Sequence, residues 1–319
     1  RGGETAYYEW ALPRVLAAIE EARDRLEPVE LGAGSGIEGR YAFNRRAVGR
    51  DGQVFMPGRG WPGPLGPTHL RYLEGPMDPE VGVVALRRSD GEPLALLVHH
   101  TCHPVHVFPR LEVSPDWPGA LCDCLQATHP GCTPLVLNGC CGNINPWPPF
   151  EPDYANDHHQ MGRALAEMAE KVLGTLEFTP AATLGARAVH VPLPFRPLRE
   201  EELTWAQDVL ARRPLPDWDP STPDRIDHEW VAAASVYSVH LQQQREGVLD
   251  YEAQVLRLGP AAIVGLPGEP FVEGQLALKL ASPAYPTYVA HCATEYVGYI
   301  PTAAALQRGG HEVNTRYWA

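Results

Sequence analysis

The sequence of 319 residues lacks any apolar run long enough to span a membrane, which excludes an integral membrane protein. Lysine is scarce, since Lys171 and Lys279 are the only two, and the 26 basic residues are outnumbered by 39 acidic ones. The formal net charge is −13. Because an electrostatic nucleic-acid binder needs a positive surface for the phosphates, this balance argues against nucleic acid as a partner.

The sequence also lacks a Cys-x-x-Cys pair, so a structural zinc knuckle is not expected. Its seven cysteines are an odd number, and Cys140 and Cys141 are adjacent. This usage favours reduced thiols and a cytoplasmic setting over secretion. The chain starts at Arg1 without a methionine or a signal peptide, so we expect further residues upstream and read no localisation from this end.

What the chain does contain is typical of a loop-rich globular protein: 44% hydrophobic residues, with 33 prolines and 30 glycines. Apolar spacing predicts helices at Thr5–Leu26, Asp157–Leu173, Arg199–Arg212, His228–Arg245 and Phe271–Leu280. Strands are expected at Val81–Arg88, Leu94–Thr101, Pro134–Asn138, Thr183–Leu193, Tyr251–Leu258, Ala261–Leu266 and Thr287–Cys292.

This alternation of strands and helices predicts an α/β or mixed α+β fold, with layered β-sheets flanked by helices. Loops are expected at 57–67, rich in Gly and Pro, and at 214–227, rich in Pro and Asp. The second loop is a possible domain boundary. We interpret it as an insertion within a single domain over 1–319, because the candidate chemical residues lie on both sides of it.

The densest chemical signal is a run of histidines at His99, His100, His103 and His106. Neutral imidazole is the commonest metal ligand, whereas any one of these side chains is as easily an ordinary core or surface residue. Pro104 should end the strand and place His103 at its carboxyl end, where α/β sheets carry their sites.

Further candidates lie in tight turns. Asp116 can orient a histidine or cap the helix that follows it. In Gly139-Cys140-Cys141-Gly142-Asn143, free amides can bind an oxyanion and Cys141 can act as a nucleophile, although buried cysteines usually only pack. Glu269, between Gly268 and Pro270, is suited to bind a metal or act as a base, or else to stabilise a helix N-terminus.

In this order, the motifs resemble the catalytic domain of the neutral, non-lysosomal ceramidase family, including its short bacterial members. The segments that carry the resemblance are Cys102–Val107, Ser114–Gly119, Asn138–Pro146, Leu266–Glu269 and Tyr299–Thr302, and it extends roughly from Tyr8 to Val313. The resemblance implies a zinc-dependent amidase of lipid metabolism that cleaves N-acylsphingosine.

The family holds its zinc with two His, one Glu and one Tyr, and His103, Glu269 and Tyr299 match three of these positions. The remaining ligand belongs to a T-H-T-H-S-G motif that would precede the helix at Tyr8, upstream of this sequence. Arg45 matches the family's anion-stabilising arginine. The family's immunoglobulin-like C-terminal domain has no counterpart here.

Two positions depart from the family pattern. Cys141 stands where the family has its active-site serine, and His311 stands where it has a substrate-contacting tyrosine. These changes bear on the substrate more than on the metal chemistry, so a smaller amide than N-acylsphingosine is the alternative. The oligomeric state cannot be inferred from the sequence.

The mechanism that follows is attack by a zinc-activated water on an amide or ester carbonyl. Arg45 and the amides around Cys141 would stabilise the oxyanion, and His311 or His106 would protonate the leaving group. One alternative is a binding protein that keeps the fold without a complete metal site. Another is an amidohydrolase in which Cys141 is the nucleophile.

Overall fold

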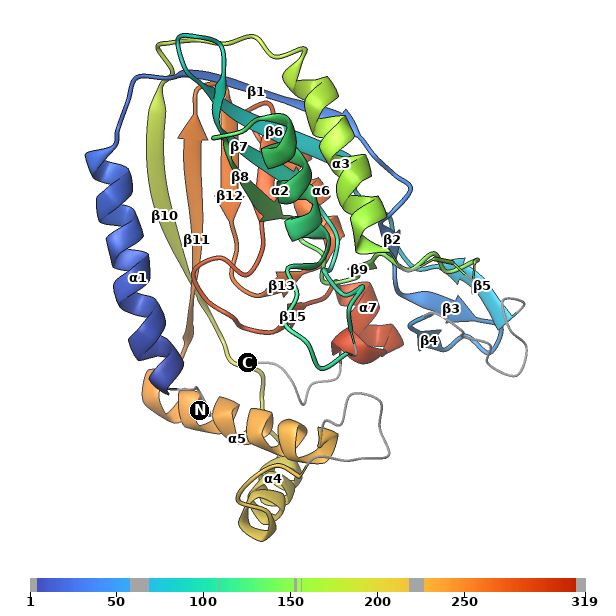
Figure 1. Cartoon of the computed structure of the whole chain (residues 1–319). Coiled ribbons are helices and arrows are strands. Elements are labelled where there is room, and N and C mark those ends of the chain that lie inside the picture. Colours follow the sequence, from blue (N-terminus) through green and yellow to red (C-terminus); the bar gives the residue numbers. More distant parts are fainter. Residues whose placement is uncertain are drawn as a thin grey trace.

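A computed structural model of the chain describes residues 5–57, 69–108, 110–151, 154–155, 157–217 and 227–313 (Figure 1). Most of the expected loop at 57–67, and residues 218–226 of the loop at 214–227, lie outside the described residues. The layered, mixed α/β fold is confirmed. Among the described residues, no helix is long and apolar enough to cross a membrane.

The first of two four-stranded sheets has the order β1-β6-β7-β8. Its strands are β1 (Glu30–Ile37), β6 (Glu80–Arg87), β7 (Pro93–His100) and β8 (Thr133–Asn138). The pairs β1·β6 and β6·β7 are antiparallel, and the pair β7·β8 is parallel. The carboxyl ends of β7 and β8 therefore lie together, which places the segments after His100 and Asn138 side by side.

The second sheet has the order β10-β11-β12-β14. Its strands are β10 (Leu184–Leu193), β11 (Leu249–Leu258), β12 (Ala261–Gly265) and β14 (Thr287–Ala290), and only β12 and β14 are parallel. It packs against the first sheet through Leu31, Val84, Ile263 and Tyr288. This contact brings the chain after β12 and β14 toward the chain after β7.

Two helices cover the other face of the first sheet, α2 (Asp116–Thr128) and α3 (His158–Leu173) (Figure 1). The core between them and the sheet contains Trp117, Leu121, Met161 and Leu165, all fully buried. Asp157 caps α3 by accepting hydrogen bonds from the backbone N–H groups of His159 and Gln160.

The remaining helices are α1 (Thr5–Asp24), α4 (Glu200–Arg212), α5 (His228–Glu246), α6 (Val272–Ala281) and α7 (Ala303–Arg308), with a 3-10 turn at His311–Val313. Helices α4 and α5 pack on each other around Ala206, Val209 and Val236. Helix α1 is present where the apolar spacing predicts it, but none of its residues is buried.

Seven short strands connect these elements: β2 (Phe43–Asn44), β3 (Ala47–Gly49), β4 (Val54–Phe55), β5 (Leu70–Leu73), β9 (Ile144–Asn145), β13 (Glu269–Pro270) and β15 (Tyr299–Ile300). They form the pairs β2·β9 and β13·β15 and a small sheet β4-β3-β5. The pair β13·β15 carries Glu269 and Tyr299, and Arg45 directly follows β2.

Candidate active site

Glu269 and Tyr299 are brought together by the parallel pair β13·β15, in which they are direct partners. Backbone hydrogen bonds from Glu269 N to Gly298 O, 2.8 Å, and from Phe271 N to Ile300 O, 3.1 Å, hold the pair in register. Two side chains distant in sequence thus leave neighbouring strands at the same level. This arrangement is what a shared binding site requires.

His103 reaches Glu269 from the loop after β7. Its Nε2 lies 2.9 Å from Oε2 of Glu269, and its Nδ1 lies 3.0 Å from the carbonyl oxygen of Ile144. Because a carbonyl only accepts hydrogen bonds, Nδ1 carries the proton and the lone pair of the neutral ring is on Nε2. That lone pair faces a carboxylate, so a proton or a cation has to lie between the two groups.

Tyr296 fixes the other carboxylate oxygen of Glu269, since its hydroxyl donates to Oε1 at 2.7 Å. Burial raises the pKa of Glu269, but the hydrogen bond with His103 and the charge on that ring outweigh it and lower the pKa to about 2. Burial and the neighbouring Glu269 raise the pKa of Tyr296. Glu269 is therefore ionised at neutral pH and Tyr296 is a hydrogen-bond donor.

Tyr299 completes the group that we call the candidate centre: His103, Glu269 and Tyr299. Its ring centroid lies 6.3 Å from that of His103 and 5.8 Å from that of His311. Burial raises the pKa of Tyr299 to about 12, against the opposing charge of Arg45. The structure thus places the three expected ligands close together, with His311 beside the phenol.

Arg45 lies over this phenol, with its guanidinium carbon 5.2 Å from the centre of the Tyr299 ring. Its Nε donates to Glu312 at 2.7 Å and its Nη1 to Asn145 at 3.2 Å. Burial opposes the charged form, yet Tyr299 and Glu312 raise the pKa of Arg45. Arg45 therefore stays cationic where the sequence predicts an anion-stabilising group, although Glu312 already balances its charge.

Arg46 shares the same counter-ion, because its Nη1 donates to the second oxygen of Glu312 at 2.6 Å. It also contacts Glu74 and donates to the carbonyl of Gly309 at 2.8 Å. Glu312 is only 1% exposed. Glu312 thus bridges two adjacent buried guanidinium groups, and together with Glu74 it balances their two charges and fixes the wall of the candidate centre.

Cys141 contacts the candidate centre through His291, whose Nε2 lies 3.6 Å from the cysteine Sγ. The two rings of His291 and His103 are 6.4 Å apart. The Cys141 side chain is fully buried, and burial raises the pKa of its thiol well above the usual value. The pair has the composition of a thiol and a base, but the burial favours the neutral thiol.

Two amides of the turn around Cys141 already have partners within the protein. The N–H of Gly142 donates to Pro270 O at 3.1 Å, and that of Cys140 donates to the side chain of Gln275 at 2.7 Å. A Cβ on Gly142 would lie 2.4 Å from the carbonyl oxygen of Glu269. The glycine thus allows the turn to pack against β13, and an oxyanion would have to compete with Pro270 for the Gly142 amide.

The histidines of the dense run do not form one cluster. His99 and His100 are buried in the core, where they contact the carbonyls of Val289 and Glu80 at 3.1 Å. His106 bonds Asp116, with 2.7 Å between its Nδ1 and the carboxylate Oδ1. Of the run, His103 alone belongs to the candidate centre. Asp116, the first residue of α2, orients a histidine and accepts a hydrogen bond from Trp117 N, but it does not cap the helix.

The donor set of the candidate centre, one imidazole nitrogen, one carboxylate and one phenol, suits zinc with a further ligand in a fourth position. Among the described residues no group of three or more His, Cys, Asp and Glu side chains is arranged to hold a metal ion. A site here therefore has to include the phenol. The 2.9 Å contact of His103 Nε2 with Glu269 Oε2, where a metal ion can replace the shared proton, is the observation that fits a cation.

Two residues of this region had no assigned role at the level of sequence. His291 follows the short strand β14, and the only local signal would have been a histidine directly after an apolar strand. Tyr296 stands three positions before Tyr299, in a segment where a tyrosine is usually packing. Their roles come from contacts across the fold.

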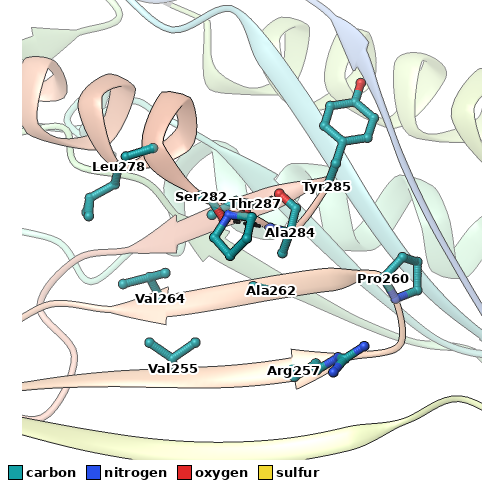
Figure 2. Close-up of a pocket in the computed structure, with 12 residues that line it drawn as sticks. Val255, Arg257, Pro260, Ala262, Val264, Leu278, Ser282, Ala284, Tyr285 and Thr287 are labelled. Atoms are coloured by element: carbon teal, nitrogen blue, oxygen red, sulfur yellow. Dashed lines mark hydrogen bonds between the residues drawn. The ribbon is translucent and has the colours of Figure 1, made fainter.

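A cavity of about 670 Å³ lies away from these residues on the second sheet (Figure 2). Figure 2 shows Val255 and Val264 on β11 and β12, with Leu278 of α6 and Tyr285 of the following loop around them. The candidate centre contributes no side chain to this lining. Its wall is mostly apolar, and its polar members are Arg257, Ser282, Tyr285 and Thr287.

Comparison with known proteins identifies the fold. No known family profile matches the sequence, and no curated protein sequence matches it. Among solved structures, the neutral ceramidase from Pseudomonas aeruginosa matches with a TM-score of 0.62, 17% identity, and coverage of 94% of this chain and 51% of that chain. A ceramidase complexed with C2 matches with a TM-score of 0.61, 16% identity, and coverage of 94% and 52%.

The layered α/β chain therefore has a ceramidase-like fold. The chain spans about half the length of these two neighbours. At this level of identity the likeness establishes the architecture, while activity has to be argued from the side chains of the candidate centre.

Proposed function

We propose that the protein is a zinc-dependent hydrolase that cleaves an amide bond. The observation that supports this most directly is the 2.9 Å contact between His103 Nε2 and the Glu269 carboxylate, with Tyr299 on the neighbouring strand. A proton fills the contact between the nitrogen and the oxygen when the ring is charged, and a metal ion can take its place. The ceramidase-like fold supports an amide as the substrate class.

His103, Glu269 and Tyr299 would hold the metal, which supplies Lewis acidity and activates water near neutral pH. The carbonyl of Ile144 accepts a hydrogen bond from His103 Nδ1 and so keeps Nε2 available as a ligand. Tyr296 donates to Oε1 of Glu269 and so holds Oε2 toward His103 and the metal position. Arg45 stabilises negative charge on the carbonyl oxygen of the substrate. His311, beside Tyr299, is positioned to give a proton to the leaving nitrogen.

The substrate we propose is N-acylsphingosine or a smaller related amide. Two alternatives remain: a ceramidase-like binding protein without catalysis, and an amidohydrolase in which Cys141 attacks with His291 as base. The 3.6 Å contact of Sγ with Nε2 favours the second alternative, and the raised pKa of the buried thiol counts against it.

Zinc content measured by mass spectrometry tests the proposal. We expect about one zinc per chain after zinc loading and gel filtration, and strongly reduced binding in Glu269→Gln and His103→Gln. Glu295→Gln, an exposed carboxylate nearby, is the matched control and should leave zinc content unchanged. Equal zinc content in all four proteins would reject the ligand assignment.

Hydrolysis of short and long N-acyl amides separates the three functions. Activity that a chelator abolishes and zinc restores supports the metal enzyme. Activity that iodoacetamide abolishes but a chelator does not supports the Cys141 enzyme. Amide binding without hydrolysis in the zinc-loaded protein supports the binding protein.

A further inference from the structure

Helix α1 carries an apolar stripe that the rest of the described chain leaves uncovered. The stripe consists of Tyr8, Leu12, Val15 and Ile19, which recur at positions i, i+4, i+7 and i+11. Each of the four residues is 55 to 64% exposed. No residue of α1 is buried, and Figure 1 shows the helix at the outside of the molecule. Because helices owe most of their stability to packing of an apolar face, this stripe needs a partner surface.

The cavity of about 670 Å³ on the second sheet is an open apolar groove. Its floor includes Val255 of β11 with Ala262 and Val264 of β12, and Leu278 of α6 stands at one wall (Figure 2). Side chains along a strand point alternately to the two faces of a sheet, so this floor lies opposite Ile263, which packs against the first sheet. The first sheet therefore leaves the groove uncovered.

The helix and the groove face match in length and in kind. Helix α1 has 20 residues and is about 30 Å long, and β10 and β11 have 10 residues each and are about 33 Å long. The apolar surface continues from the groove onto β10, where Val189 and Val191 are exposed on the same face. Amphipathic helices bind such surfaces through apolar side chains spaced as they are in the α1 stripe.

The charges beside the stripe and on the groove face have opposite signs. Helix α1 has four acidic and two basic residues, a net charge of −2, and Glu9 and Glu20 flank one side of the stripe. The groove face carries Arg257 on β11 and Arg187 on β10, since Arg187 is the strand partner of Val255. Both acidic residues of β11 alternate with these positions and point to the opposite face. Opposite charges at the rim favour and orient binding of the helix.

The area of the stripe decides how many such contacts a stable complex needs. At roughly 100–150 Å² of exposed surface per large apolar side chain, the four residues supply about 400–500 Å². One helix in one groove therefore buries about 900 Å² counted on both surfaces, which is below the range of about 1,200–2,000 Å² for stable interfaces. Two reciprocal contacts bury about 1,800 Å² and lie within that range.

We propose that two copies of the chain exchange α1, so that the apolar stripe of each copy lies in the groove of the other. A twofold arrangement covers the stripe and the groove of both copies at once. Helix α1 is joined to β1 by residues 25–29 alone, so the helix can bind a second copy while both sheets stay intact. The groove shares no lining residue with the candidate centre, so the exchange is independent of the proposed function.

Size-exclusion chromatography with light scattering on the full chain tests the exchange. We expect a particle of twice the 35.0 kDa mass of the chain. Ile19→Asp on the stripe and Val255→Glu in the groove should each raise the dissociation constant of the dimer by at least about thirtyfold, because each places a charge in both buried contacts. Ala17→Asp and Gln254→Glu are the matched controls, since they add the same charge on the opposite faces of α1 and β11 and should leave the dimer unchanged.

A mixture of Ile19→Asp with Val255→Glu separates helix exchange from pairing of two like surfaces. The intact groove of the first variant accepts the intact helix of the second, so mixed dimers should form where each variant alone is monomeric. Ile19 is exposed, so its variant remains informative even if Val255→Glu fails to fold. A wild-type chain that stays monomeric at about 100 µM, or a dimer that Ile19→Asp leaves intact, would overturn the proposal. A monomer whose α1 is protected from hydrogen exchange would place the helix within its own copy and would also overturn it.

Discussion

The side chain of Gln275 connects the segment after β7 to the turn after β8. Its Oε1 accepts the backbone N–H of Cys140 at 2.7 Å, and its Nε2 donates to Thr101 at 2.7 Å and to Asp78 at 2.6 Å. Gln275 is fully buried. The loops that carry His103 and Cys141 are therefore tied together by one amide from α6.

Replacing Gln275 with methionine keeps the volume and removes all three hydrogen bonds. We expect a loss of about 2–4 kcal/mol in the free energy of unfolding, because buried partners are left unsatisfied. Urea denaturation followed by circular dichroism measures this, with Gln244→Met on exposed α5 as control. A loss no larger than that of the control would show that the amide has no role in stability.

Zinc should stabilise the protein if the candidate centre binds it. Adding zinc at about 100 times its dissociation constant should raise the free energy of unfolding by about 2.7 kcal/mol, and a chelator should reverse the shift. Thermal unfolding with and without zinc measures the effect. In Glu269→Gln the shift should vanish. A zinc-dependent shift of the same size in that variant would place the metal elsewhere.

The cysteines near the candidate centre should differ in reactivity. Cys292 is an exposed residue, and partial burial of its thiol raises its pKa to about 11. Cys141 is fully buried, and burial raises the pKa of its thiol well above the usual value. Iodoacetamide should therefore label Cys292 before Cys141, as mapped by peptide mass spectrometry over time. Faster labelling of Cys141 would support the alternative in which it is a nucleophile.

Stability should fall on mild acidification because His99 and His100 are buried as neutral rings. Burial lowers both pKa values, that of His99 to about 3. Below pH 6.5 the unfolded chain takes up protons that the folded chain refuses, so stability present above pH 6.5 is lost as the pH falls. The limiting slope is roughly 1.4 kcal/mol per pH unit for each histidine.

Urea denaturation at pH 7.5, 6.5 and 5.5 measures this dependence. The carboxylates with lowered pKa values, such as Glu269 and Asp78, add to the loss only below about pH 4.5, where these side chains begin to protonate in the unfolded chain but stay ionised in the folded one. His99→Gln should reduce the slope, and His190→Gln, an exposed ring, should leave it unchanged. A flat profile from pH 7.5 to 5.5 would contradict the burial of neutral rings.

Two glycines should respond to alanine in opposite directions. A Cβ at Gly82 in β6 would lie 2.0 Å from the Tyr288 ring, so Gly82→Ala should destabilise the protein by about 1–3 kcal/mol. Gly274 in α6 has nothing within 4 Å of the same position, so Gly274→Ala should stabilise by about 0.5–1 kcal/mol. Thermal unfolding of both variants checks the contrast, which equal shifts would contradict.

Local patterns predicted the long elements well, since the apolar period of the chain from Val81 to Thr101 is enough to define β6 and β7. They failed for β1, whose sequence Glu30–Ile37 is rich in glycine and has low strand propensity. The structure explains this composition, because Cβ atoms at Gly34 and Gly36 would lie 2.7 Å from Leu176 and 2.6 Å from Met168. Close packing against Leu176 and Met168 requires glycine in β1, and glycine has a low strand propensity, so propensity alone does not predict this strand.

The residues of the candidate site also fall into two groups, those that local sequence marks and those that only the fold reveals. His103 and Glu269 stand next to prolines in short, rigid motifs, which is why the sequence alone marks them. His291 and Glu312 have no such local context, and their partners Cys141, Arg45 and Arg46 are far away in the chain. Roles that depend on a distant counter-ion or base become visible only when the topology is known.

The shared counter-ion Glu312 has a consequence for biosynthesis. Arg45 and Arg46 leave the ribosome early, and Arg46 finds Glu74 soon afterwards, whereas Glu312, the partner of Arg45, arrives only near the end of translation. Until then the nascent chain can bury the Arg45 guanidinium only at a high electrostatic cost. The wall of the candidate centre therefore forms late, and a chain that stops before Glu312 should leave this wall unformed even if both sheets have assembled.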